Sequence, residues 1–432
     1  MSRRRRISRG TAGVRAARGI EPRRFGWVLG GGGARGAYEI GVCDYIFTQV
    51  ARELGQALPL DVVSGTSVGA IHACAIAAGV DDARAVTRAL VARWSTLEMR
   101  DVVHVDRRRA FDTIRALFGR PPRRSGADTS RGGILDPRPL ETLLSAAIDF
   151  RRISEHIRAR RLHAVSVTAT HVASGRTTVF FQGAAGGPQP WVRGRTWAFP
   201  TSLSAAHAMA SAAIPFLFPA VRVRGALYCD GSLRQHVPLS PARRLGARAL
   251  IVINPRAPRA VPEVEEPERE RVFPGPIFLL GKVLNALSLD RVDGDVERLE
   301  LVNRLLAAGT RQFGPSFIEK LNADLVSGGD APVNPIPLLH LQSSQDIGRL
   351  GAAYVRSRPF RERKLGVVER ALARLAENES EKEADLLSYV LFDGGFAREL
   401  IDLGRRDAEA QHDRIVAFFR AANEAASSDA AA

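Results

Sequence analysis

One serine between two glycines stands out in this 432-residue chain as a potential nucleophile. Ser67 is the central residue of Gly65-Thr66-Ser67-Val68-Gly69, which fits the pattern G-x-S-x-G. Residues 60–64 before it predict a short buried strand, and the apolar, Ala-rich residues 70–78 after it predict a buried helix. A strand, a tight turn and a helix in this order form the context in which a serine hydroxyl is exposed for attack.

The neighbours of Ser67 fit that chemistry. Gly65 and Gly69 let the strand and helix backbones pass close to each other. The helix N-terminus that follows Ser67 favours negative charge near the hydroxyl. Glycine and serine are common in turns, however, so a solvated serine in an ordinary strand–helix turn is the alternative.

A glycine run near the N-terminus is the second candidate for chemistry. A predicted strand, Phe25–Leu29, leads into Gly30 and then into Gly31-Gly32-Gly33-Ala34-Arg35-Gly36, and a helical pattern follows. Such a run presents backbone N–H groups to an anion. It also fits the dinucleotide fingerprint, but that motif needs an acid at the end of the second strand, where this chain has Ser64 to Ser67. Because neighbouring strand–helix turns open on the same sheet edge, we favour an oxyanion hole that serves Ser67.

Composition and length indicate a globular chain with one large core or two smaller ones. Hydrophobic residues make up 45% and charged residues 25%. The three cysteines, Cys43, Cys74 and Cys229, form no C-x-x-C, which argues against a zinc site or a disulfide framework and fits a reducing compartment. No apolar run reaches the ~18–20 residues of a membrane-spanning helix, and no secretory signal follows the N-terminal arginines. We therefore expect a cytoplasmic protein without a metal or cofactor.

Positive charge is concentrated at the N-terminus. Residues 1–24 hold nine arginines and a single acid, Glu21, and so supply +8 of the formal net charge of +16. This stretch lacks hydrophobic periodicity and is predicted to be a disordered tail. It can contact anionic lipid on the inner face of a membrane, while a plainly solvated tail is the alternative and no nucleic-acid partner is expected.

The middle of the chain continues the strand–helix pattern. The Arg-rich stretch 100–131 favours a lid or lipid-facing loop, with a solvated loop as the alternative. The remaining elements are then predicted from β-rich runs, small-residue runs and turn signals. We expect strands over 162–169, 177–181, 227–229 and 248–254, the last of them the final parallel strand, and helices over 81–94, 204–213 and 238–245.

The order of three motifs resembles the patatin-like phospholipases: the run 31–36, the pentapeptide 65–69, and Asp230-Gly231 after a strand. The resemblance covers roughly Phe25 to Asn254. It implies a three-layer α/β/α doubly wound fold with a mostly parallel sheet, and hydrolysis of lipid acyl esters by a Ser–Asp dyad without histidine. On this resemblance Ser67 is the nucleophile and Asp230 the proton acceptor.

Other site residues follow from the same resemblance. Backbone N–H groups of the run 31–36 hold the oxyanion, while Arg35 braces that loop or approaches a lipid phosphate. Ile214 to Pro219 lines the site. Ser232 departs from the usual glycine or alanine after Asp-Gly and adds a hydroxyl near the dyad. The second Asp-Gly-Gly, at Asp393, follows an apolar helical run, so we predict a turn at the C-terminal end of a helix.

The last third of the chain changes from alternating strand and helix patterns to helical patterns. We divide the sequence into the tail 1–24, a catalytic domain 25–255, a charged Pro-rich linker 256–275, a helical region 276–422 and a disordered tail 423–432. Long bacterial patatin-like proteins resemble this organisation. Helical periodicity is visible over 277–289, 299–306, 316–325, 367–375, 386–392, 396–403 and 412–419.

Two other functions remain open at this stage. A Ser-His-Asp hydrolase shares the pattern around Ser67 and would use His236 as its base. Against it, the serine lies only about 40 residues after the first strand. A catalytically silent lipid-binding protein is the other alternative.

Overall fold

The computed structural model describes residues 24–102, 104–105, 133–257, 292–328, 332–362 and 384–431. The predicted segments 277–289 and 367–375 lie outside the described residues. So do the tail 1–24 apart from Arg24 and nearly all of the Arg-rich stretch 100–131 and the linker 256–275.

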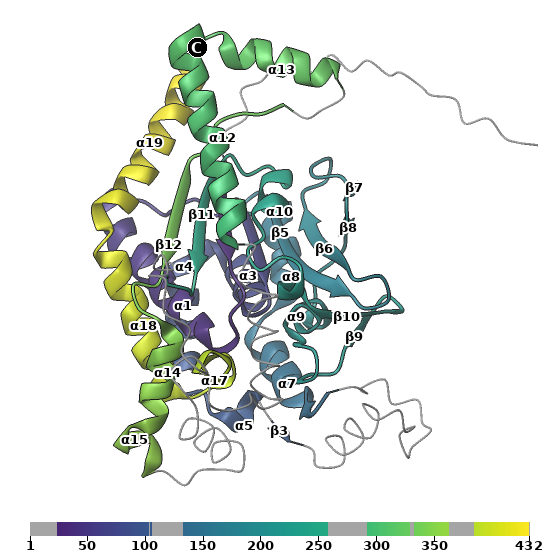
Figure 1. Ribbon diagram of the computed structural model, residues 1–432, viewed down its shortest axis with the longest axis vertical. Coiled ribbons are helices and arrows are strands. Elements are labelled where there is room, and N and C mark those ends of the chain that lie inside the picture. Colours follow the sequence, from purple (N-terminus) through teal and green to yellow (C-terminus); the bar gives the residue numbers. More distant parts are fainter. Residues whose placement is uncertain are drawn as a thin grey trace, which may run out of the picture.

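A ten-stranded mixed sheet forms the centre of the molecule (Figure 1). Its main path is β12-β11-β1-β2-β5-β6-β8-β7, and β10 pairs with β5 and with β9. The first five strands of that path run parallel to one another, whereas β6 and β10 are antiparallel to β5. The bounds are β1 Phe25–Leu29, β2 Val62–Thr66, β5 Ala164–His171, β6 Arg176–Gly183, β7 Trp191–Arg193, β8 Thr196–Pro200, β9 Val221–Val223, β10 Ala226–Asp230, β11 Ala249–Asn254 and β12 Leu338–Gln342.

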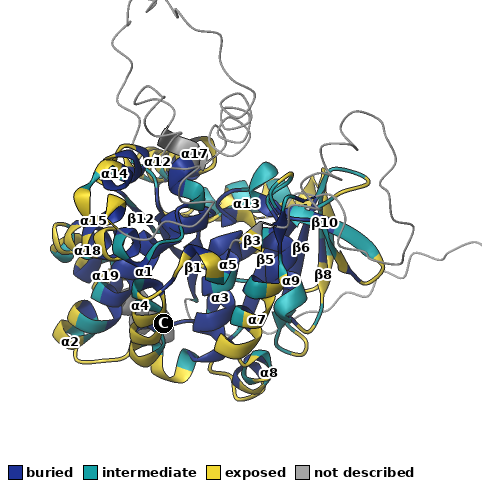
Figure 2. Cartoon of the chain, turned by 90° about the horizontal axis from the view of Figure 1, so that it is seen from below, coloured by how far each residue is buried: buried dark blue, intermediate teal, exposed yellow. Residues whose placement is uncertain are grey.

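Helices cover both faces of this sheet, which is why its central strands are buried (Figure 2). Successive residues of β1 show the division: Trp27 belongs to the hydrophobic cluster that includes residues of α1, α3, α9, α18 and α19, and Val28 to the cluster that includes residues of α10 and α12. These helices are α1 Gly36–Tyr45, α3 Val68–Ala78, α9 Ala205–Ala212, α10 Leu239–Arg244, α12 Val292–Phe313, α18 Gly394–Glu409 and α19 His412–Ala431. The predicted three-layer α/β/α class with a mostly parallel sheet is confirmed.

The described chain also contains a second sheet and further helices. A two-stranded sheet pairs β3 His104–Val105 with β4 Leu135–Asp136. The remaining α-helices are α2 Ala51–Leu54, α4 Ala83–Ser95, α5 Met99–Val102, α7 Arg138–Ala147, α8 Phe150–Arg158, α13 Phe317–Ser327, α14 Ile347–Arg356, α15 Arg358–Arg361 and α17 Ala384–Val390. No helix in the described ranges combines the length and apolarity needed to cross a bilayer.

The C-terminal region differs from the prediction in three places. It is not purely helical, because β12 extends the sheet by pairing in parallel with β11, so 248–254 is not the last parallel strand. Asp393 follows a helix, α17, as expected, but it caps the start of the next one: its Oδ1 accepts the N–H groups of Gly395 and Phe396 as the N-cap of α18. The backbone of α19 is helical to Ala431, whereas a disordered tail was expected over 423–432.

Helix α18 packs closely against α1. A Cβ added to Gly41 would lie 2.1 Å from the carbonyl oxygen of Ile401, and one added to Gly404 would lie 2.3 Å from that of Tyr38. Arg405 then donates two hydrogen bonds, of 2.9 and 2.8 Å, to Asp44 Oδ2. Glycines on both helices therefore allow the C-terminal region to sit directly on the helix that follows the glycine-rich loop.

This contact gives a stability prediction. Gly41→Ala should lower the free energy of unfolding by about 1–3 kcal/mol, because the methyl group meets backbone that can move only with the helix. Urea unfolding followed by circular dichroism measures the change. Gly294→Ala in α12 is the matched control: nothing lies within 4 Å of its added Cβ, so stability should stay level or rise. Equal midpoints for Gly41→Ala and wild type would contradict the prediction.

Candidate active site

The sheet brings Ser67 and Asp230 together. Strand β2 ends at Thr66, opposite Thr168 of β5, and β10 ends at Asp230, opposite the next β5 residue, Ala169. Because β2 is parallel and β10 antiparallel to β5, their last residues meet end to end. Ser67 Oγ donates a 2.6 Å hydrogen bond to Asp230 Oδ2, and both residues are 3% exposed.

The turn at Ser67 has the strained backbone of a nucleophile elbow. Ser67 has φ 55° and ψ −127°, a region that residues with a side chain rarely occupy. Both flanking glycines are needed for this turn. A Cβ on Gly65 would lie 2.1 Å from the carbonyl oxygen of Gly69, and a Cβ on Gly69 would lie 2.4 Å from that of Gly30. The predicted strand–turn–helix context is thus present around Ser67.

A second serine, which the sequence alone did not single out, holds the elbow in place. Ser211 of α9 accepts the backbone N–H of Ser67 at 2.8 Å and donates its hydroxyl to the carbonyl oxygen of Thr168 at 2.6 Å. Both hydrogen bonds are buried, so they are stronger than at a wet surface. The signal was a polar residue inside a small-residue helix, at a position that becomes fully buried.

Asp230 is fixed from several sides. Its Oδ1 accepts the N–H of Ser232 at 2.7 Å, and its own backbone bonds to Ala213 and to Thr170 Oγ1. Burial raises the pKa of Asp230 to about 6, although the hydrogen bonds from Ser67 and Ser232 act in the opposite direction. A carboxylate with such a pKa accepts a proton near neutral pH better than an ordinary aspartate does.

His236 lies near the glycine-rich loop but is not joined to the pair. Its carbonyl oxygen accepts the N–H of Gly31 at 3.1 Å, while its Nδ1 has no partner among the described residues. Burial, with the charges of Arg256 and Arg35, lowers its pKa to about 3, so the ring is neutral. Within the described chain no hydrogen bond connects this ring to Ser67 or Asp230, as a Ser-His-Asp arrangement requires.

The glycine-rich loop offers three backbone N–H groups. The N–H of Gly31 bonds to His236, that of Arg35 to Gly32, and that of Gly36 to Gly33. Those of Gly32, Gly33 and Ala34 have no acceptor in the described part of the chain. Gly33 also lines the same cavity as Ser67, so its N–H is well placed to meet a developing negative charge.

Arg35 braces this loop against the C-terminal region. It is only 4% exposed, its Nε donates to Ser388 Oγ at 2.8 Å, and its guanidinium lies 4.2 Å from the centre of the Tyr389 ring. Ser388 and Tyr389 belong to α17. A Cβ on Gly33 would lie 2.2 Å from the carbonyl oxygen of Tyr389, so α17 covers the loop closely. Of the two roles predicted for Arg35, these contacts support bracing.

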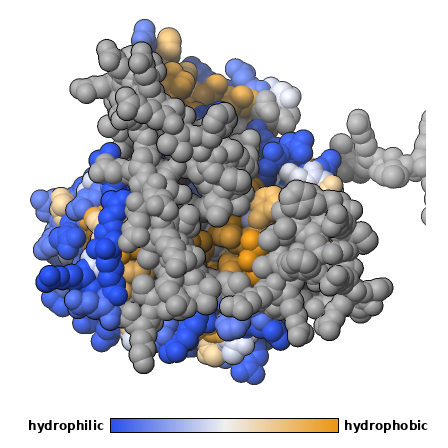
Figure 3. Space-filling view, turned by 60° about the horizontal axis from the view of Figure 1, so that its bottom comes forward, coloured by the Kyte–Doolittle hydropathy of each residue, from blue (hydrophilic) through white to orange (hydrophobic). Residues whose placement is uncertain are grey.

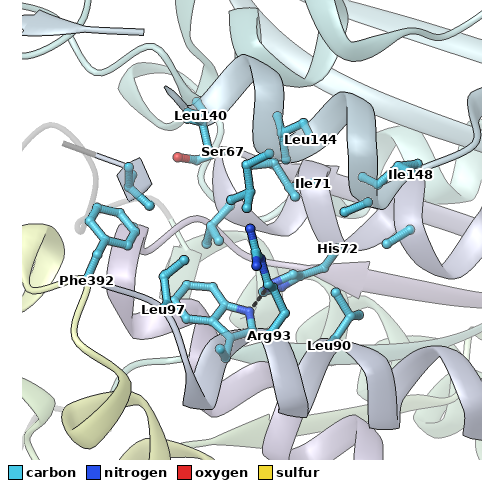
Figure 4. Close-up of a pocket in the computed structure, with 18 of the residues that line it drawn as sticks. Ser67, Ile71, His72, Leu90, Arg93, Leu97, Leu140, Leu144, Ile148 and Phe392 are labelled. Carbon is cyan, nitrogen blue, oxygen red and sulfur yellow. Dashed lines mark hydrogen bonds between the residues drawn. The ribbon is translucent and has the colours of Figure 1, made fainter. Parts of the chain in front are cut away.

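An apolar cavity opens beside Ser67 (Figure 4). Its floor is one face of α3, its walls are α4 and α7, and the segment 212–218 lies near the Ser67 end. Figure 3, in which the lower side of Figure 1 comes forward, shows apolar side chains gathered in a recess of that face. The lining includes Val68, Ile71, Ala75, Leu90, Trp94, Leu97, Leu140, Leu143, Leu144, Ile148, Ile214, Phe218 and Phe392.

A buried polar chain supports the floor of this cavity. Trp94 Nε1 donates to His72 Nε2 at 3.1 Å, and His72 Nδ1 lies 2.9 Å from Glu39 Oε2. Because Nε2 accepts from the tryptophan, the proton of the neutral ring is on Nδ1 and is donated to Glu39. Burial lowers the pKa of His72 to about 3 and raises that of Glu39. These bonds tie α1, α3 and α4 together behind Ser67.

Cofactor sites are not visible in the described part of the chain. There, no three His, Cys, Asp or Glu side chains lie close enough to hold a metal ion. Strand β2 ends at Thr66 without the acid that a dinucleotide site needs.

The family follows from a comparison with known sequences. A family described as Patatin-like phospholipase matches residues 27–243, just over half of the chain. The chain therefore belongs to the patatin-like phospholipases, a family of lipid hydrolases. The matched residues include the glycine-rich loop, Ser67 and Asp230. No curated protein matches the chain.

Similar solved structures include bacterial proteins of low sequence identity. The crystal structure of VipD from Legionella pneumophila is 14% identical, with a TM-score of 0.29 over 88% of this chain and 67% of that one. A chain in the structure of full-length SpcU in complex with full-length ExoU, from the type III secretion system of Pseudomonas aeruginosa, is 15% identical. Its TM-score is 0.26, over 84% of this chain and 70% of that one.

The strained elbow gives a second stability prediction. Ser67→Gly should be more stable than Ser67→Ala by about 1 kcal/mol, because glycine takes positive φ without steric cost whereas alanine keeps the strain. Both variants lack the hydroxyl, so their difference isolates the backbone term. Chemical unfolding of the two purified proteins measures it. An alanine variant that is as stable as the glycine variant would mean that the turn is unstrained.

The buried carboxylate makes stability depend on pH. Its pKa is about 6 in the folded chain and ~3.9 in an unfolded one, so the folded state binds more protons between these values. The contribution of Asp230 to stability is therefore full below pH ~4 and is lost as the pH rises through 6.

Asp230→Asn removes that dependence. The stability of the variant relative to wild type should increase by about 2–3 kcal/mol between pH 4 and pH 8. Unfolding in urea at both pH values tests this. Asp82→Asn, the same substitution at an exposed helix cap, is the control. If the difference in stability between Asp230→Asn and wild type were the same at pH 4 and pH 8, the pKa of the Asp230 carboxyl group would be the same in the folded and unfolded chain.

Proposed function

We propose that this protein hydrolyses acyl esters of lipids, as a phospholipase A or lysophospholipase, with Ser67 as nucleophile and Asp230 as proton acceptor. The observation that carries the proposal is the 2.6 Å hydrogen bond from Ser67 Oγ to Asp230 Oδ2 beside an apolar cavity. A hydroxyl bonded directly to a carboxylate of raised pKa can lose its proton as it attacks.

The first half of the reaction forms an acyl-enzyme. Ser67 Oγ attacks the ester carbonyl carbon, and its proton passes to Asp230 Oδ2. The resulting oxyanion accepts hydrogen bonds from the free N–H groups of Gly32 and Gly33, and the N–H of Ala34 is a third free donor. Each such donor lowers the activation free energy by ~2.7–4 kcal/mol. The carbon–oxygen bond to the alcohol then breaks, and Asp230 returns the proton to the departing oxygen.

The second half releases the fatty acid. Asp230 takes a proton from a water molecule, which attacks the acyl carbonyl. The ester bond to Ser67 breaks, and the serine recovers its proton from Asp230. Gly31, Arg35 and Gly36 shape the loop in this scheme, because their own N–H groups are already bonded.

The cavity suits the acyl chain of the substrate. Its lining is apolar along α3, α4 and α7, so a hydrocarbon chain is removed from water there at ~25 cal/mol per Å² of apolar surface. Phe216, at the rim segment, has φ 69° and is 45% exposed, although its neighbours Ile214 and Phe218 line the cavity. An exposed aromatic ring at this place fits an enzyme that meets a lipid surface.

The basic tail 1–24 completes the proposal. Its arginines would hold the enzyme peripherally at the anionic inner face of a membrane, at ~1 kcal/mol per basic residue near the surface. The protein would then work in the cytoplasm, on lipid presented by that face.

Three variants test the chemistry. Ser67→Ala should abolish hydrolysis of p-nitrophenyl acyl esters and labelling by a fluorophosphonate, and Asp230→Asn should lower kcat by several orders of magnitude because the two groups act as a unit. His236→Asn should stay within a few-fold of wild type. Loss in His236→Asn as large as in Asp230→Asn would favour a Ser-His-Asp mechanism. Wild-type protein without labelling or turnover would favour a silent lipid-binding protein.

A further inference from the structure

Among the described residues, Arg93 is the one arginine or lysine that lines the apolar cavity. It lies on α4 with Leu90 and Trp94, at the spacing that places side chains on one helix face, and these three line the cavity together with Leu97, just beyond the helix end. Figure 4 shows its side chain extending from α4 toward the residues of α3. Arg93 is also exposed, so it stands at the rim and not in the floor.

No carboxylate neutralises Arg93 in the described part of the chain. Its guanidinium makes no hydrogen bond or ion pair with the described residues, whereas Arg152 pairs with Asp81 and Arg405 with Asp44. Its neighbour on the same helix, Arg88, points away from the cavity and donates to the carbonyl oxygen of Arg84. A guanidinium left unpaired beside an apolar ligand site is a donor set for an anion on the ligand.

The separation between Arg93 and Ser67 indicates where on the ligand this anion lies relative to the ester. Trp94, the next residue, bonds to His72, which follows Ser67 by five residues on α3. At 1.5 Å of rise per residue, His72 lies ~7–8 Å along α3 from Ser67, and Arg93 lines the cavity beside the Trp94 that contacts it. In a glycerophospholipid, five or six single bonds separate the ester carbonyl carbon from phosphorus, and such a chain reaches roughly 6–7 Å when extended.

We propose that Arg93 binds the phosphate of a glycerophospholipid whose acyl ester lies at Ser67. The inference rests on the proposed function and adds the substrate feature that the site selects. Arg35, in the glycine-rich loop itself, is already bonded to Ser388 and packed on Tyr389, so it is not available for this contact. Arg93 would therefore distinguish phospholipids from neutral glycerol esters.

The test compares two substrates that share one acyl chain: a short-chain lysophosphatidylcholine and the matching monoacylglycerol, both below their micelle concentrations. Arg93→Gln should lower kcat/KM for the phospholipid ~10–100-fold, mainly through KM, because a charge-assisted hydrogen bond is lost. Its kcat/KM for the monoacylglycerol should stay within about two-fold. Arg93→Lys should recover part of the lost kcat/KM for the phospholipid, since the positive charge remains but the paired N–H donors of the guanidinium do not.

Arg88→Gln is the matched control, because it makes the same change on the same helix away from the cavity, and it should leave both substrates unaffected. An equal loss on both substrates in Arg93→Gln, or no loss on either, would overturn the assignment. Since Ser67→Ala must abolish turnover of both, these outcomes leave the proposed function standing.

A binding measurement covers the remaining case, in which the wild type turns over neither substrate and the proposed function fails. Calorimetry with monomeric dodecylphosphocholine should show binding at least ~10-fold weaker to Arg93→Gln than to wild type, while binding of a neutral dodecyl glycoside should not change. If wild type and Arg93→Gln bound the phosphocholine with equal affinity, Arg93 would not bind the phosphate and the proposal would be wrong.

Discussion

Strand β5 sets the geometry on which the site depends. Its first part, Ala164 to Thr168, pairs with β2, and Ala169 to His171 pairs with β10 along the same edge. The two neighbours therefore end one residue apart in register, and the hydroxyl of Ser67 reaches Asp230 without any connecting side chain. Because side chains alternate along a strand, a slip of β10 by one residue would turn Asp230 to the opposite face of the sheet.

The rest of the site stabilises a combination of groups that would otherwise be unfavourable. A serine with positive φ and a fully buried carboxylate both raise the energy of the folded chain. Ser211 holds the first and Ser232 the second by hydrogen bonds to or from the backbone. These hydrogen bonds offset the cost of keeping the Ser67 hydroxyl and the Asp230 carboxylate in contact away from water. Such a conflict between function and stability is common at active sites.

Local sequence was enough to place most of the site. The glycines around Ser67 and in the loop 31–36 are needed for close backbone contacts, and such needs are visible in short motifs. Contacts made across long stretches of sequence were not visible. Ser211 lies 144 residues from Ser67, and Ser388 lies 353 residues from Arg35. Strand β12 is short and only alternately buried, so it carried too weak a pattern to be predicted.

Strand β12 has a consequence for how the chain can be divided. In the described part of the chain it is the strand that pairs with the outer edge of β11, whose sequence Ala-Leu-Ile-Val-Ile-Asn is buried throughout. A shortened chain that ended after residue 255 would leave a row of unpaired backbone groups beside apolar side chains. Such an edge is a template for pairing with another copy, and from there for aggregation. By pairing with β11, strand β12 of the C-terminal region therefore keeps this edge of the sheet from pairing with other copies of the chain.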